Sequence, residues 1–98
     1  MGTTVVLLEI QIKPECVGEV KAFLKEALPD TRAYAGCQGV DIYGNLDEST
    51  NLVFYERWES RGHYEKYLSW REETGVLKEL GSKLSKEPSI RYYDRIDV

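Results

Sequence analysis

The chain has 98 residues and a mass of 11.3 kDa, which suits one small domain, so we expect residues 1–98 to fold as a single unit. Its composition, 42% hydrophobic and 31% charged with three prolines, excludes disordered and low-complexity chains. The net charge of −4 and the scattered basic residues argue against a nucleic-acid partner, and no apolar run reaches the roughly 20 residues of a membrane-spanning helix. We expect a cytoplasmic protein with neither nucleic-acid nor membrane partners.

The N-terminal third predicts a strand followed by a helix. Residues Thr3–Ile12 are rich in β-branched side chains and alternate in their second half, which predicts a strand. Apolar residues then repeat at helical spacing, and Pro14 suits the first turn of a helix, where its missing N–H costs nothing. We expect this helix to run to about Leu28, because Pro29 interrupts or bends it, with a last turn over residues 31–34.

The remaining segments predict a hairpin, two helices and a final strand. The β-prone residues form two runs, Cys37–Gly44 and Asn51–Glu59, which a polar turn separates. Ser60 is expected to cap a helix, and Thr74-Gly75 to separate that helix from a shorter one. Residues Ser89–Val98 alternate and predict the last strand. The short helix is expected to carry Val76, Leu77, Leu80 and Leu84.

The predicted order β-α-β-β-α-α-β is the split βαβ, or ferredoxin-like, topology of an α+β protein, in which helices cover one face of an antiparallel sheet. The first and third strands are nevertheless apolar on both faces. The second face therefore needs a cover, and a second copy related by a two-fold axis supplies one, so we predict a homodimer through the sheet face. In the first strand Val5 and Leu7 oppose Val6 and Leu8, and in the third strand Leu52, Phe54 and Trp58 oppose Val53 and Tyr55.

Motifs for metal or nucleotide chemistry are absent from the sequence. The chain has one histidine, His63, and two cysteines, Cys16 and Cys37, which form neither a CxxC pair nor a metal-ligand spacing. No Gly-x-Gly-x-x-Gly or Walker pattern occurs. The cysteines lie at opposite ends of the first predicted helix, so we expect two reduced thiols. We therefore expect no metal site and no nucleotide site.

Carboxylates on the predicted strands are candidate general bases. Glu9, Glu56 and Asp94 each point to one face of the sheet, and burial would raise the pKa of such a side chain into the range that suits proton transfer. The alternative is a solvated or ion-paired strand residue, because arginines on the same strands offer partners. The alternative is the more ordinary interpretation for each of the three.

Aromatic residues concentrate on the strands and on the helix after the third strand, as expected for an aromatic-walled pocket between sheet and helices. Ordinary core packing accounts for about half of such a set. Trp58, Tyr67 and Trp70 lie where the third strand passes into its helix, and they are the strongest pocket candidates. The whole set is Tyr43, Tyr55, Trp58, Tyr64, Tyr67, Trp70, Tyr92 and Tyr93.

Four segments together point to a known family: Tyr55-Glu-Arg-Trp-Glu-Ser60, Tyr64-Glu-Lys-Tyr-Leu68, Lys13-Pro14 and Gly36-Cys37-Gln-Gly39. They resemble the antibiotic biosynthesis monooxygenase family, and the resemblance spans nearly the whole chain. Members are dimeric α+β barrels with a ferredoxin-like protomer, and several oxidise an aromatic substrate with O₂ and no metal or flavin. The resemblance thus implies a homodimeric monooxygenase without a cofactor, which uses O₂ as co-substrate on a small aromatic or quinol-type molecule.

The resemblance also implies site residues. Trp58 matches the family's tryptophan at the end of the third strand, His63 matches a histidine of some quinol-oxidising members, and Tyr67 lies where those members often have a second histidine. Leu7 and Tyr67–Trp70 lack the asparagine and axial histidine of haem-degrading relatives, which argues against haem. We expect Trp58, Tyr67 and His63 to be catalytic, with Tyr67 or His63 handling the proton of a substrate hydroxyl. The expected substrate-binding residues are Phe54, Tyr55, Trp70 and Arg71, of which Arg71 would steady an oxyanion.

Two other classes of function compete with this interpretation. A non-catalytic dimeric sensor or carrier would hold a small aromatic molecule in the same pocket, and the lack of a conventional base favours it. Substrate-dependent O₂ consumption would separate it from a monooxygenase. An RNA-binding module shares the strand and helix order, but the third strand lacks the basic-glycine-aromatic pattern and the net charge has the wrong sign.

Overall fold

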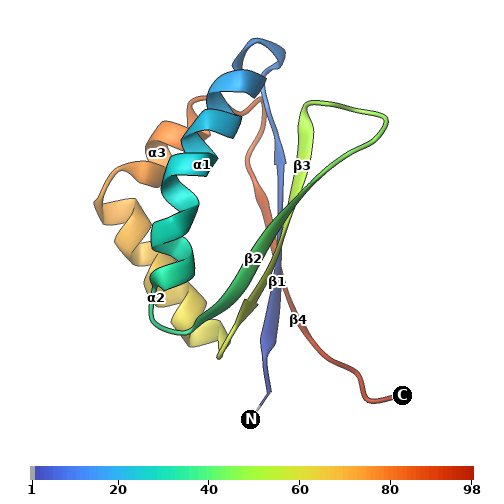
Figure 1. Ribbon diagram of the computed structural model, residues 1–98, viewed down its shortest axis with the longest axis vertical. Coiled ribbons are helices and arrows are strands. Elements are labelled where there is room, and N and C mark those ends of the chain that lie inside the picture. The colour runs from blue at the N-terminus through green and yellow to red at the C-terminus, as the bar shows by residue number, and fades with distance from the viewer. Residues whose placement is uncertain (1) are drawn as a thin grey trace.

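The computed structural model describes residues 2–98 as a four-stranded antiparallel sheet with three helices on one face (Figure 1). The strands are β1 (Thr4–Gln11), β2 (Cys37–Gly44), β3 (Asn51–Trp58) and β4 (Ser89–Asp94). The helices are α1 (Val17–Ala33), which a 3-10 turn at Pro14–Cys16 precedes, α2 (Arg61–Glu73) and α3 (Val76–Gly81). The strand order β2-β3-β1-β4 confirms the predicted α+β, ferredoxin-like topology.

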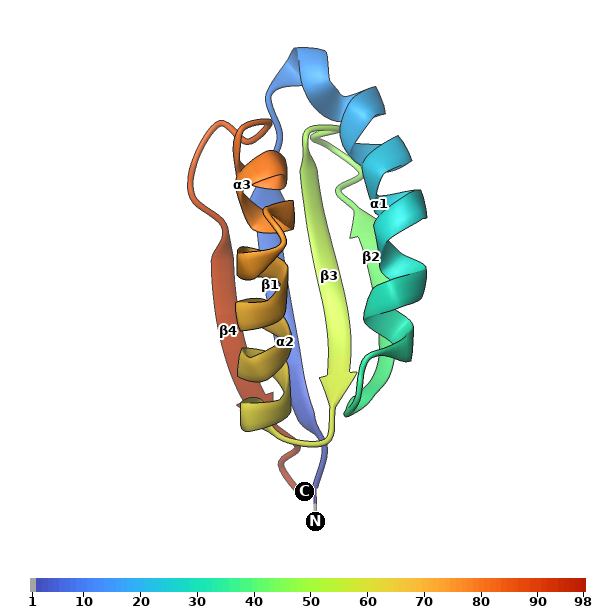
Figure 2. The ribbon, with the colours of Figure 1, turned by 90° about the vertical axis from the view of Figure 1, so that its left-hand side faces the viewer.

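The helices form one layer over the sheet in two parts (Figure 2). α1 lies over the β2 side, α2 and α3 lie over the β4 side, and β3 is visible between them. In the register of β1 with β3, Val6 lies opposite Glu56 and Leu8 lies opposite Phe54. Side chains alternate along a strand, so these four residues all face the helices.

The covered face of the sheet holds two packed clusters. The larger cluster is mainly aliphatic and includes Val20 and Leu24 of α1. The smaller cluster is centred on Trp58 and Tyr64, which are 0% and 1% exposed. Burying aromatic side chains of this size contributes strongly to the stability of a small core. The aromatic cluster thus anchors the junction between β3 and α2.

The first helix is longer than the sequence predicts. α1 continues through Pro29 to Ala33, although a proline inside a helix removes one backbone hydrogen bond. Packing explains this result, because Leu28 and Thr31 are both buried and Thr31 bonds to side chains of α2. The prediction that the helix ends near Leu28 is therefore wrong, whereas the helical turn that was expected after Pro29 is present as the last turn of α1.

Two boundaries near the C-terminus also differ from the prediction. β4 ends at Asp94 rather than at Val98, because Asp94 pairs with Thr4, the first residue of β1. Leu84 lies beyond the end of α3 and forms an isolated bridge with Ile12. The side chain of Leu84 still belongs to the aliphatic core, so its burial does not depend on helical structure.

The sheet face opposite the helices is uncovered within residues 2–98, and no helix lies against it in either view (Figures 1 and 2). Partly exposed apolar side chains of the two central strands point to this face. They are Val5 and Leu7 from β1 and Val53 and Tyr55 from β3. This is the second apolar face that the sequence predicts, and a partner on it stays a prediction.

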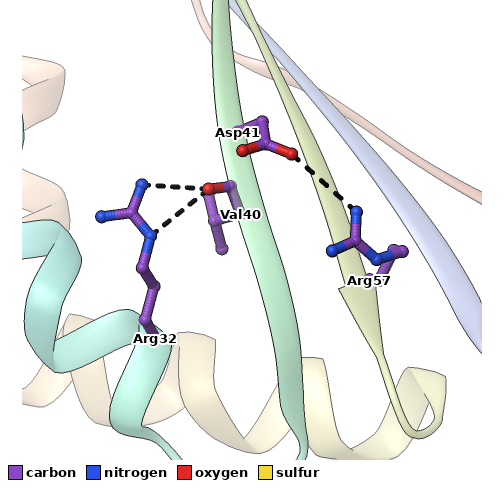
Figure 3. Close-up of polar contacts among 4 residues, drawn as sticks. All are labelled: Arg32, Val40, Asp41 and Arg57. Carbon is purple, nitrogen blue, oxygen red and sulfur yellow. Dashed lines mark hydrogen bonds and ion pairs between the residues drawn. The ribbon is translucent and has the colours of Figure 1, made fainter.

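The edge strand β2 makes polar contacts on both of its sides (Figure 3). Arg32 of α1 donates from Nη2 to the Val40 carbonyl at 3.0 Å, which satisfies a backbone acceptor of this edge strand. On the other side, Arg57 Nη1 lies 3.9 Å from Asp41 Oδ2. These two side chains are partly exposed, so the ion pair contributes little to stability.

Within residues 2–98, no helix is both long and apolar enough to cross a membrane. Cys16 and Cys37 are free cysteines, each partly buried. Among the same residues, no three His, Cys, Asp or Glu side chains gather in a way that suits a metal ion.

Candidate functional site

A small, partly enclosed cavity lies between the sheet and the helices. Its volume is about 50 Å³, and its walls come from β1, β3, α1, α2 and α3. Most of the wall is aliphatic, with leucines from both the sheet and the helices. A mainly apolar cavity with a few converging polar groups is the usual form of a small-molecule site. The polar side chains in the wall are Thr31, Glu56, Tyr64, Tyr67 and Arg71.

Glu56 is the buried carboxylate of this wall. The residue is 3% exposed, and the Trp58 indole Nε1–H donates to its Oε1 at 3.0 Å. Burial raises the pKa of Glu56 to about 7, and the hydrogen bond from Trp58 partly opposes that rise. The carboxyl group is therefore partly ionised near neutral pH, where a side chain can accept a proton and return it.

Arg71 of α2 places a buried positive charge at the same cavity. The residue is 5% exposed, and no carboxylate of residues 2–98 forms an ion pair with it. Its Nη2 donates to the Ala27 carbonyl at 2.7 Å and to Thr31 Oγ1 at 2.9 Å, and its Nε donates to the Tyr67 hydroxyl at 2.9 Å. A buried cation that lacks a counter-ion favours an anion beside it.

Two tyrosines of α2 complete the polar part of the wall. The Tyr67 hydroxyl shares a hydrogen bond of 2.6 Å with Thr31 Oγ1. The ring of Tyr64 lies 5.5 Å from that of Trp58, and burial, assisted by the charge of Glu56, raises the pKa of Tyr64 well above its ordinary value. Tyr64 therefore stays protonated at neutral pH.

The structure brings some of the predicted site residues together. Phe54, Tyr67 and Arg71 line the cavity. Trp58 and Trp70 lie behind this wall, with rings 5.1 and 6.1 Å from the ring of Tyr67. Because Trp58 is 0% exposed, its ring faces are already filled by neighbouring side chains. Both tryptophan rings pack near Tyr67, and neither lines the cavity.

His63 and Tyr55 lie apart from the cavity. His63 is in the first turn of α2, where Ser60 caps the helix as predicted by accepting from the His63 backbone N–H at 3.1 Å. The His63 ring packs on Gly36, which has a φ of 93° and lacks room for a Cβ. Tyr55 points to the uncovered face, because adjacent strand residues point to opposite sides and Phe54 faces the helices.

The polar wall also contains Glu56, which the sequence offers as a candidate general base, Tyr64 of the aromatic set, and Thr31, which the sequence does not single out. The sequence predicts the face of Glu56, because Glu56 is two residues from both Phe54 and Trp58 and therefore lies on the same side of the strand. Tyr64 is three residues before Tyr67, so the two lie on the same side of a helix. Nothing local marks Thr31, because its role depends on how α1 packs against α2.

Fold and site together define an α+β protein with a partly enclosed, mainly apolar cavity, lined by five polar side chains, between a ferredoxin-like sheet and its helices. The family described as Antibiotic biosynthesis monooxygenase matches residues 3–72 of the sequence. This range contains every polar residue of the cavity wall. The chain belongs to the antibiotic biosynthesis monooxygenase family.

Solved structures give the same assignment of fold. A conserved protein of Methanosarcina mazei Go1 is 26% identical, with a TM-score of 0.86 over 95% of this chain and 92% of that one. A protein named antibiotic biosynthesis monooxygenase is 19% identical, with a TM-score of 0.87 over 96% and 99%. Rv0793 from Mycobacterium tuberculosis is 22% identical, with a TM-score of 0.85 over 98% and 97%. A comparison with curated proteins gives no significant match.

Proposed function

We propose that this protein is a monooxygenase that needs no cofactor and oxidises a small hydroxyarene or quinol with O₂ as co-substrate. Family membership supports the monooxygenase class. The observation that carries the substrate class is Arg71, a guanidinium that is 5% exposed at the wall of a mainly apolar cavity and has no carboxylate partner among residues 2–98. Such a cation stabilises the oxyanion of an ionised hydroxyl far better than the neutral hydroxyl.

An ionised hydroxyarene supplies the electrons for its own oxidation. One hydroxyarene and one O₂ give one quinone and one water, so one oxygen atom enters each product and no external reductant is needed. In this proposal Arg71 holds the substrate oxygen and Tyr67, which Arg71 and Thr31 fix in place, contacts the same oxygen. Phe54 and the aliphatic walls exclude water. This proposal assigns no role in the reaction to His63, because His63 does not line the cavity.

The cavity must widen to accept such a substrate. Its volume of about 50 Å³ is roughly a third of the 150 Å³ that holds benzene in a protein interior. α3 is the wall that moves at the lowest cost, because it has 6 residues and follows Gly75, which has a φ of 82°. We expect substrate access through outward displacement of α3, which contributes Val76, Leu77 and Leu80 to the wall.

The proposed functional unit is a cytoplasmic homodimer. Support for the dimer comes from the uncovered sheet face, where Val5, Leu7, Val53 and Tyr55 remain partly exposed. A two-fold related copy of the same face would bury these side chains, as symmetric dimers commonly do. The two free cysteines are compatible with a reducing compartment.

The test measures O₂ uptake by the metal-stripped protein with a panel of small quinols and hydroxyarenes. We expect uptake above the autoxidation background, and we expect R71Q to lower kcat/KM by about 100-fold, because a preorganised oxyanion contact is removed. R61Q is the matched control, since Arg61 lies on the same helix and pairs with Glu65 at the surface. R61Q should retain wild-type turnover.

Three results would separate the alternatives. Uptake whose kcat/KM falls by about 100-fold in R71Q and stays at the wild-type value in R61Q supports the proposal. Uptake by R71Q within about threefold of the wild type would contradict the oxyanion role of Arg71. Binding without uptake, detected by quenching of Trp58 or Trp70 fluorescence, would show instead a non-catalytic carrier or sensor.

A further inference from the structure

We propose that Glu56 is the general base of this site, which accepts the proton of the substrate hydroxyl while Arg71 stabilises the oxygen that loses it. The inference rests on the proposed function and adds a catalytic residue to it. The carboxylate of Glu56, which is 3% exposed, and the guanidinium of Arg71, which is 5% exposed, line one cavity, yet they form no ion pair with each other.

The position of Glu56 in β3 leaves its carboxylate available to a ligand. The strand alternation directs Glu56 to the same side as Phe54 and Trp58, toward the helices. Trp58 donates to Oε1, and this is the single hydrogen bond that the Glu56 side chain makes within residues 2–98. Since a carboxylate accepts several hydrogen bonds, Oε2 retains its full accepting capacity.

A purely structural role does not account for an acid at this position. A glutamine would accept the same Trp58 hydrogen bond without the cost of burying a charge, and no cation of residues 2–98 pairs with Glu56 to offset that cost. Buried unpaired carboxylates are expensive and concentrate at functional sites. The geometry therefore favours a proton-transfer role over packing.

Of the titratable groups in this part of the site, Glu56 is the one that changes its charge near neutral pH. Tyr64 of α2 has a pKa well above its ordinary value through burial, and burial also raises the pKa of the Cys37 thiol of β2, so both are neutral there. Arg71 of α2 is always charged. Tyr67 of α2 already shares its hydroxyl between Thr31 and Arg71. The pKa of Glu56 itself is about 7.

The proton-transfer step is balanced within the site. The substrate O–H bond breaks, its proton moves to the Glu56 carboxylate, and its electron pair stays on the oxygen beside Arg71. A ring carbon of the resulting phenolate gives an electron pair to O₂ and forms a C–O bond, and Glu56 returns its proton to the outer oxygen of the hydroperoxide. The O–O bond then breaks as the same ring carbon loses its C–H proton, so the carbon becomes the quinone carbonyl and the departing oxygen, with both protons, leaves as water. Holding base and cation in one cavity makes the transfer possible without bulk solvent.

The kinetic test compares Glu56→Gln with Glu59→Gln, an exposed glutamate just after β3 that serves as the matched control. In the wild type, kcat/KM for the O₂-consuming reaction should rise with pH up to about 7 as Glu56 ionises. E56Q should lower kcat/KM by about 100-fold or more and remove this pH dependence, whereas E59Q should match the wild type. Turnover by E56Q within about threefold of the wild type would overturn the proposal.

A binding test decides the role of Glu56 even if no O₂ is consumed. The probe is 4-nitrophenolate, a coloured anion that the protein does not need to oxidise, added under argon at about pH 8. Phenolate and Glu56 carboxylate in one cavity must share a proton, so we expect the wild type to take up about one proton per probe bound and E56Q to take up none. No binding, or binding without proton uptake, would overturn the role of Glu56. Proton uptake in a protein that consumes no O₂ would sustain it while the monooxygenase function fails.

Discussion

The two faces of the sheet carry similar apolar side chains, but charged side chains are exposed on one face and buried on the other. On the uncovered face, Arg57 and Asp41 approach each other in solvent, and Glu9 is exposed. On the covered face, Glu56 and Arg71 are buried, unpaired with each other, and line a cavity. A strand glutamate becomes chemically useful through its face and its burial, because burial raises the pKa of Glu56 to about 7.

The largest expected effect is a difference in unfolding free energy between a substitution on the covered face and one on the uncovered face. Trp58→Ala removes a fully buried ring that contacts Tyr64 and Tyr67 at ring distances of 5.5 and 5.1 Å. We expect the free energy of unfolding to fall by about 3–5 kcal/mol in a urea titration, because the substitution leaves a large cavity. Tyr43→Ala, at a residue that is 58% exposed, is the control and should cost less than about 1 kcal/mol. Equal losses would contradict the distinction between the faces.

The next effect concerns the buried charge. The pKa of Glu56 is raised from an ordinary 4.5 to about 7 in the folded protein, so the folded state holds this proton more tightly than the unfolded state. The contribution of Glu56 to the unfolding free energy therefore falls as pH rises from about 4.5 to about 7, and it is unfavourable by about 3 kcal/mol above that range.

Glu56→Gln tests this sign directly. We expect E56Q to be as stable as the wild type near pH 4, and more stable near pH 8 by up to about 3 kcal/mol, because the amide is never charged. Urea unfolding of both proteins at the two pH values measures the difference. A stability gap that does not change with pH would mean that Glu56 is solvated in the folded protein.

The smallest expected effect on the protomer lies on the uncovered face. Leu7→Glu places a carboxylate at the centre of the proposed dimer interface, directly opposite Arg91 of β4, which lessens the cost within one protomer. Sedimentation should show a wild-type dimer and an L7E monomer whose own unfolding free energy changes by less than about 1 kcal/mol. Lys25→Glu, on the exposed side of α1, should leave the dimer intact.

A monomeric wild type would contradict the dimer, and a dimeric L7E would place the interface elsewhere. Either result leaves the covered face unaffected, because Leu7 does not line the cavity. Oligomeric state and turnover can therefore be tested independently in the same variant.

The amino-acid sequence by itself determined the order of the elements, because that order depends on local patterns. Alternation predicts the strands, and helical spacing predicts the helices. Ser60 caps α2 by accepting from the backbone N–H of His63, only three residues further along the chain. The same alternation separated two apolar sheet faces. It also places Glu56 on the same side of β3 as Phe54 and Trp58, and it places Tyr55 on the opposite side.

Tertiary structure alone decided which of these residues meet. α1 runs past Pro29 because packing of its last turn outweighs a lost hydrogen bond, and that turn brings Thr31 to Arg71, 40 residues away in sequence. The burial of Glu56 and the enclosure of Trp58 depend on helices that arrive from distant parts of the chain. Burial, and the pKa that follows from it, is a property of the assembled layers, so no local sequence pattern specifies it.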